Sequence, residues 1–220
     1  MQFHKAILPA VVAGASIVAA SLPARAAVIQ YTDRNAFLAA LSSSSTDNYD
    51  DLTTALYPSP LTRAIPAYSY NGAAANGLTA SSSNGSQVLS TNFAEALTLN
   101  FTSGAPTAVG GYFFNTDISF NVINRVITVT ANPGASTQAV VTGSGTNFFG
   151  WLDDSGTPFT SLVIEPGAGS PTAFATVDDL ILGQAAPAQV PGPLPVIGAA
   201  AAFLISRRLR SRIAAARPRA

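Results

Sequence analysis

The chain has 220 residues, 48% hydrophobic and 10% charged, which suits one domain of ordinary size. It has no cysteine and a single histidine, His4, which excludes disulfides, thiol nucleophiles and Ser-His-Asp or Cys-His catalytic sites in the body of the chain. The formal net charge is zero, yet the segment from Ala27 to Val190 carries eleven acidic residues against three arginines, a net charge of −8, so binding to a nucleic-acid backbone is not expected.

Residues 1–26 are typical of a secretory signal peptide. Lys5 precedes an apolar stretch that runs from Ala6 to Leu22. The small residues Ala24 and Ala26 then form a cleavage site directly before Ala27. We expect the secretion machinery to export the chain and a signal peptidase to cut after Ala26. The alternative is an uncleaved membrane anchor.

Residues 27–184 predict an all-β domain, an antiparallel β-sandwich or jelly roll that begins with one short helix. The helix is expected over residues 32–41, capped by Thr32, with Phe37 and Leu41 on one face. Beyond it the hydrophobic period is mostly two, as in the segment 96–101 (ALTLNF). Strands are expected at residues 68–70, 88–91, 97–101, 108–115, 125–130, 137–142, 148–152, 161–165 and 175–182.

Turn residues punctuate these strands, among them Asn71-Gly72, Asn76-Gly77 and Asn84-Gly85. Short strands with such punctuation favour a sandwich, and no internal repeat of fixed period points to a propeller or solenoid. Most of the core volume is expected from aromatic residues: Phe113, Phe114, Phe148, Phe149, Trp151, Phe159 and Phe174.

Acidic pairs are the candidate metal ligands. Carboxylate oxygens suit Ca²⁺, so Asp50, Asp51, Asp178 and Asp179 form a candidate structural calcium site, with no other cofactor expected. Within a regular strand neighbouring side chains point to opposite faces, which would place Asp178 with Leu180 and Leu182 and Asp179 on the other face. The alternative is that these carboxylates are simply solvated.

Catalysis has few possible residues in this sequence. Only a carboxylate pair of the glycosidase type remains, and the sequence does not show which acids would be paired. We therefore predict that the protein is not an enzyme. Tyr112 and Trp151 are candidates for a platform on which a sugar ring could stack, and core packing is the alternative for Trp151.

The segment after the sandwich combines three features. Residues 185–195 form a linker with four prolines, Leu194–Ile205 is an apolar run of 12 residues, and residues 207–220 are basic. As a helix the run would be about 18 Å long against a hydrocarbon core of about 30 Å, so a short transmembrane helix over 196–206 would hold the chain only transiently in the inner membrane. The basic residues would stay in the cytoplasm, led by Arg207, Arg208 and Arg210.

This tail resembles a PEP-CTERM sorting signal of Gram-negative bacteria. The resemblance covers the proline motif, the apolar run and the arginine cluster; the motif comprises Val190, Pro191, Gly192, Pro193, Leu194 and Pro195. It implies cleavage near the motif by an exosortase-like enzyme and delivery to the cell surface or an exopolysaccharide matrix. The usual motif has Glu where Gly192 stands, and the replacement of Glu by Gly matches a variant form of the signal. Tails of this kind also carry the name ice-binding protein C-terminal domain, which says nothing about ice.

The body resembles secreted sandwich domains that precede such tails, through segments such as AVGGYFFNTD and ATVDDLILG. In similar carbohydrate-binding sandwiches an acidic residue on the last strand contributes to a calcium site, which implies a role for Asp178 or Asp179. The expected function is therefore an exported, non-catalytic surface or matrix protein. The alternatives are a carbohydrate-binding module for exopolysaccharide and a carboxylate-dependent glycoside-active enzyme.

Overall fold

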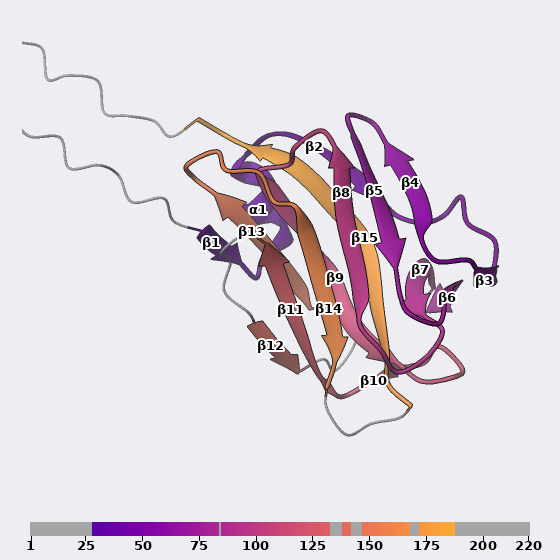
Figure 1. Cartoon of the computed structure of the whole chain (residues 1–220). Coiled ribbons are helices and arrows are strands. Elements are labelled where there is room, and N and C mark those ends of the chain that lie inside the picture. Colours follow the sequence, from indigo (N-terminus) through magenta and orange to yellow (C-terminus); the bar gives the residue numbers. More distant parts are fainter. Residues whose placement is uncertain (1–27, 84, 133–137, 142–146, 168–171, 188–220) are drawn as a thin grey trace, which may run out of the picture.

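Two antiparallel sheets pack face to face as a β-sandwich in the computed structural model (Figure 1). The structure describes residues 28–83, 85–132, 138–141, 147–167 and 172–187. The predicted fold class of the body, an antiparallel sandwich with one short helix near its start, is confirmed. The predicted signal peptide, sorting motif, transmembrane helix and basic tail lie outside the described residues.

The larger sheet, sheet A, has nine strands. In spatial order seven of them are β1 (Val28–Tyr31), β13 (Phe148–Asp153), β9 (Ala108–Thr116), β15 (Phe174–Ala185), β7 (Ser86–Thr91), β6 (Leu78–Ser83) and β3 (Ala55–Tyr57). The other two are β10 (Val122–Ile123), which pairs with β9, and β2 (Leu41–Asp47), which pairs with β15.

The smaller sheet, sheet B, has six strands, in the order β12 (Gln138–Val141), β11 (Val126–Asn132), β14 (Ser161–Pro166), β8 (Leu97–Ser103), β5 (Tyr68–Ala73) and β4 (Leu61–Ile65).

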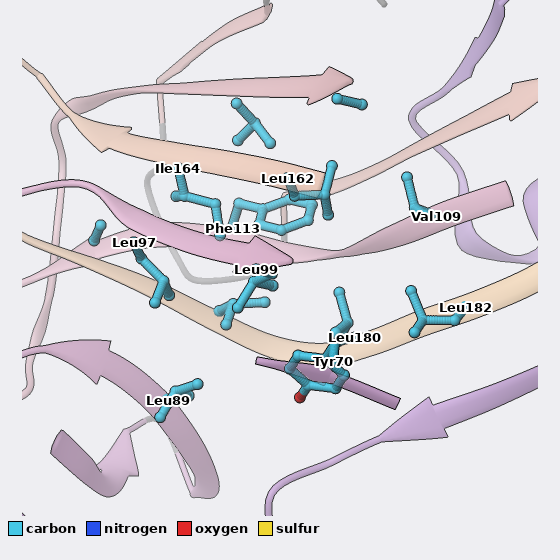
Figure 2. Close-up of a cluster of buried hydrophobic side chains, with 14 of the residues drawn as sticks. Tyr70, Leu89, Leu97, Leu99, Val109, Phe113, Leu162, Ile164, Leu180 and Leu182 are labelled. Carbon is cyan, nitrogen blue, oxygen red and sulfur yellow. The ribbon is translucent and has the colours of Figure 1, made fainter. Parts of the chain in front are cut away.

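The core lies between the sheets and follows from the alternation of side chains along each strand. In β8, Leu97 and Leu99 are fully buried while Asn100 is exposed. Leucine, valine and aromatic side chains from both sheets meet in the middle layer, as Figure 2 shows for Tyr70 and Phe113 among others. Burial of these side chains is the main favourable contribution to folding.

Helix α1 (Arg34–Ala39) covers part of the outer face of sheet A. It is shorter than predicted, and its N-cap is Asp33 rather than Thr32, because the Asp33 side chain accepts a hydrogen bond from the Ala36 amide at 2.7 Å. Phe37 lies over two glycines of the sheet. A Cβ at Gly150 would be 2.6 Å from the Phe37 ring, and one at Gly110 would be 3.0 Å from it. These glycines make room for the ring.

Several strands escaped the sequence analysis, notably β2 with its run of serines. The predicted turn at Asn71-Gly72 is wrong, because both residues lie inside β5. Gly72 serves there as a close-approach position, since a Cβ on it would be 3.2 Å from the Leu89 side chain. The predicted aromatic core is confirmed for five of the seven residues, while Phe149 and Phe174 are only half-buried.

In the part of the chain that the structure describes, no helix is long and apolar enough to cross a membrane.

Candidate functional site

A buried arginine of sheet B holds two carboxylates. The Arg63 guanidinium, on β4, donates to Asp47 through Nε at 2.9 Å and Nη2 at 2.6 Å, and to Asp51 through Nη1 at 2.8 Å and Nη2 at 2.6 Å. Tyr70 of β5 donates its hydroxyl to Asp47 at 2.7 Å and contacts the Tyr49 hydroxyl at 3.2 Å. Because Asp47 ends β2 of sheet A, this network joins the two sheets.

This network accounts for one of the four candidate calcium ligands. Both carboxylate oxygens of Asp51 accept hydrogen bonds from Arg63, and these bonds lower the pKa of Asp51. Burial, together with the charge of Asp47, raises the pKa of Tyr49 well above its ordinary value. In this arrangement Asp51 is the partner of a guanidinium, and Asp47 and Tyr70 are buried structural groups.

Asp178 and Asp179 lie where strand β15 changes its neighbour. The strand pairs with β7 as far as Val177 and with β2 from Leu180 onward. Between these stretches the register of β15 against β9 shifts, and Asp179 has a φ of 47°. The bulge overturns the predicted alternation, because Val177 and Leu180 both face the core although they are three residues apart.

The charges around this bulge are mostly negative. Burial, together with the neighbouring charges of Asp179 and Asp50, raises the pKa of Asp178 to about 6, against a smaller opposing effect of a hydrogen bond with Ser86. Arg34 of α1 approaches Asp179 with its Nη2 3.8 Å from the carboxylate. The charges of two candidate calcium ligands therefore act on a third, Asp178, and an arginine contacts Asp179.

These carboxylates do not form a recognisable metal centre. Among the described residues, no group of three or more acidic, histidine or cysteine side chains is arranged to hold an ion. Asp50 instead accepts a hydrogen bond from the Asn48 side chain at 2.6 Å. Calcium binding at Asp50, Asp178 and Asp179 stays a prediction.

The sequence contains one more pair of adjacent aspartates, Asp153 and Asp154, and the first of them has a local structural role. Asp153 is buried at the end of β13 and accepts hydrogen bonds from the Ser155 amide at 2.9 Å, the Thr157 amide at 3.3 Å and the Ser155 hydroxyl. Asp154 is exposed. Asp153 therefore stabilises the turn that follows the strand.

The two aromatic candidates do not form a common platform. Trp151 is fully buried in the layer between the sheets, 6.0 Å from Phe113 between ring centroids. Tyr112 lies on the opposite, outer face of sheet A, where its ring meets that of Phe148 at 5.7 Å. The cause is the pleat of the sheet. Successive residues of a strand alternate between the core and the outer face, and this alternation puts Trp151 and Tyr112 on opposite faces of sheet A. A sugar ring could not stack on both residues.

Two hollows of the described surface are relevant to binding. One, of about 520 Å³, lies beside β11 and β14 and is lined by Arg125, Val126, Thr128, Glu165, Pro166 and Gly167. The other, of about 140 Å³, lies on the outer side of sheet A and is lined by Leu56, Thr79, Thr91, Asn92, Asp117, Ile118, Phe120 and Phe174. We call the second hollow the outer groove. It contains the most exposed large apolar side chains of the described surface, Ile118 at 80% and Leu56 at 70% exposure.

No residue of the outer groove was predicted to bind a ligand, and Phe174 was expected in the core. One signal was present: Ile118 is a lone large apolar residue between Asp117 and Ser119, in a segment with the composition of a turn. An apolar side chain at the tip of a turn has little chance of reaching the core. Arg63 was also missed, because its partners are 12 and 16 residues away and no local pattern joins them.

The sorting and processing residues cannot be placed relative to these features. Ala24, Ala26 and Ala27 lie before the first described residue, and the proline motif and arginines lie after the last. The final strand, β15, ends at Ala185, five residues before Val190.

Comparisons with known proteins find a remote likeness in structure. No family model matches the chain, and no curated protein matches it. Three solved structures that resemble it are mutants of CBM29-2, described as a family 29 carbohydrate-binding module; their TM-scores are 0.34, 0.34 and 0.32 at 12%, 13% and 14% identity. The matches cover 60%, 65% and 65% of this chain and 86%, 100% and 100% of those chains. Similarity at this level assigns no function to the protein.

Proposed function

We propose that the chain is the precursor of an exported surface or matrix protein whose β-sandwich is a non-catalytic binding domain. The observation that carries the proposal is the amino-acid sequence of the tail, in which a proline motif, a short apolar run and an arginine cluster follow one another. A run of 12 apolar residues is long enough to hold a chain in the inner membrane for processing, but is short for a permanent span.

The limits of the sandwich agree with processing at both ends. The described strands begin at Val28 and end at Ala185. A cut after Ala26 and a cut between Val190 and Pro195 would therefore remove no described strand. The product would retain every pairing of both sheets and would carry the net charge of −8, because the arginine cluster would be lost.

The carboxylates support a role in binding or structure more than one in catalysis. Asp47 and Asp51 are bound by Arg63, and Asp153 stabilises a turn. Glu95 accepts two hydrogen bonds from Asn76, one from its amide at 2.8 Å and one from its side chain at 2.7 Å. A glycosidase needs two carboxylates that face a common cleft, whereas these four carboxylates are engaged by an arginine, a turn and an asparagine.

The proline motif provides the experiment. In the native host, Pro191→Ala combined with Pro193→Ala should cause the uncut precursor to accumulate in the inner membrane and reduce the amount of protein at the surface. Pro187→Ala is the matched control, because it removes a proline of the same linker outside the motif. Equal surface amounts for both variants would show that the motif is not a processing signal.

A further inference from the structure

The outer groove is built by a turn that is fixed to the sheet. Between β9 and β10, Asp117 accepts hydrogen bonds from the Ser119 amide at 2.8 Å and the Asn121 amide at 2.9 Å. The Phe120 carbonyl accepts a hydrogen bond from the Ser83 hydroxyl of β6 at 2.7 Å. The turn is therefore held at both its base and its tip, and Ile118 and Phe120 have a defined place beside the sheet.

One side of the groove is apolar and open to solvent. Ile118 and Leu56 are largely exposed, while Phe120 and Phe174 are half-buried. In water this exposure is unfavourable, because free energy is gained when apolar surface becomes buried. A ligand that covered these side chains would gain that free energy.

The other side of the groove carries polar groups with unused hydrogen-bonding capacity. The hydroxyl of Thr79 and the side-chain oxygen of Asn92 are 3.4 Å apart, and the Asn92 side-chain nitrogen is 3.5 Å from the Asn76 carbonyl. Both distances are at the long limit for a hydrogen bond. One carboxylate oxygen of Asp117 accepts a bond only from the Asn121 side chain, at 3.1 Å, among the contacts found for it.

This combination selects the chemistry of the ligand. A ligand with one apolar face and several hydroxyl groups would cover Ile118 and still satisfy Asn92 and Asp117. The carboxylate of Asp117, whose pKa is lowered mainly by its hydrogen bond with the Asn121 side chain, disfavours an anionic ligand, as does the net charge of the body. The volume of about 140 Å³ is well below that of a drug-sized site and fits a single small ring.

We propose that the outer groove binds one neutral sugar residue of a polysaccharide, with a C–H face of the ring on Ile118 and Phe120 and its hydroxyls on Asn92 and Asp117. This inference rests on the proposed function, because it names the ligand class and the site of the binding domain. It assigns the sugar to the outer face of sheet A, away from the buried Trp151.

The test is affinity electrophoresis of the full chain in mild detergent, in gels that contain a neutral β-glucan, a β-mannan or a galactan, with a gel that contains dextran sulfate for comparison. We expect retardation by at least one neutral polysaccharide, and any retardation by dextran sulfate, which the arginine-rich tail can bind, to be the same for the wild type and Ile118→Ser. Ile118→Ser should weaken the retardation about tenfold, since covering one large aliphatic side chain gives about that factor. Asn92→Ala should weaken it severalfold, through the loss of hydrogen bonds to the sugar.

Ile29→Ser is the matched control. Ile29 is on β1, at the far edge of the same sheet, and is also exposed, so the change is chemically the same but distant from the groove. It should leave the retardation unchanged.

Three results would overturn the inference. The first is that none of the neutral polysaccharides retards the protein. The second is that the wild type and Ile118→Ser are retarded equally. The third is that Ile118→Ser dissociates a dimer detected by light scattering, which would make the groove a contact between copies of the chain. Processing is scored separately in the native host, so failure of the sorting proposal and failure of the groove proposal are distinguishable.

Discussion

Replacement of Arg63 by methionine should cost about 3 to 5 kcal/mol of unfolding free energy. The reason is that Asp47 is only 2% exposed and would lose both guanidinium bonds, so an uncompensated charge would remain between the sheets. Asp51 is held by the same guanidinium at the same shortest distance, 2.6 Å, yet its side chain is 68% exposed. Asp51→Asn should therefore cost about 1 kcal/mol or less.

The assay is urea unfolding followed by tryptophan fluorescence, because Trp151 is the only tryptophan and is fully buried. Arg125→Met is the matched control, since Arg125 is exposed and should change stability by no more than about 0.5 kcal/mol. Asp47→Asn combined with Arg63→Met should recover part of the loss, because the buried charge is removed as well.

Two outcomes would refute this reasoning. Equal costs for Arg63→Met and Arg125→Met would mean that the buried network does not stabilise the sandwich. A cost of Asp51→Asn as large as that of Arg63→Met would mean that burial does not decide the strength of these pairs.

Further predictions concern the bulge, the helix and calcium. Because the pKa of Asp178 is raised to about 6, its contribution to stability is full below its ordinary value near 4 and is lost as the pH rises through 6; the melting temperature should fall between about pH 4 and 6, and Asp178→Asn should flatten that fall. A pH profile unchanged by the substitution would contradict the assignment. Gly150→Ala should cost about 1 to 3 kcal/mol in urea unfolding, because its methyl group would overlap the Phe37 ring, and a neutral result would mean that α1 can shift freely. If calcium binds at Asp50, Asp178 and Asp179, EGTA should lower the melting temperature at pH 7, whereas identical melts with and without EGTA would end that idea.

The fold was predictable where local pattern and burial agree. In β8 and β9 the alternating or near-continuous apolar residues indicated strands, and both strands are present. The serine run of β2 has no such pattern. It is a strand because β15 supplies its hydrogen-bond partners from more than a hundred residues away in the sequence. Pairing at that distance leaves no local signal.

The candidate site was predictable only in part, for similar reasons. The predicted calcium ligands were Asp50, Asp51, Asp178 and Asp179; the charges of Asp50 and Asp179 act on Asp178, whereas Asp51 is bound by Arg63. The bulge at Asp179 was not foreseeable, because it results from the exchange of β7 for β2 as a neighbour of β15. The outer groove depends on a turn fixed by a hydrogen bond between Ser83 and Phe120, which lie 37 residues apart.

The measurement that tests the central claim most directly is the intact mass of the protein recovered from the medium and the membranes of the native host. Export and sorting predict a species that begins at Ala27 and ends between Val190 and Pro195. A dominant species that still contains Arg207 to Ala220 would contradict the claim, because the tail would then be a retained anchor and not a processing signal.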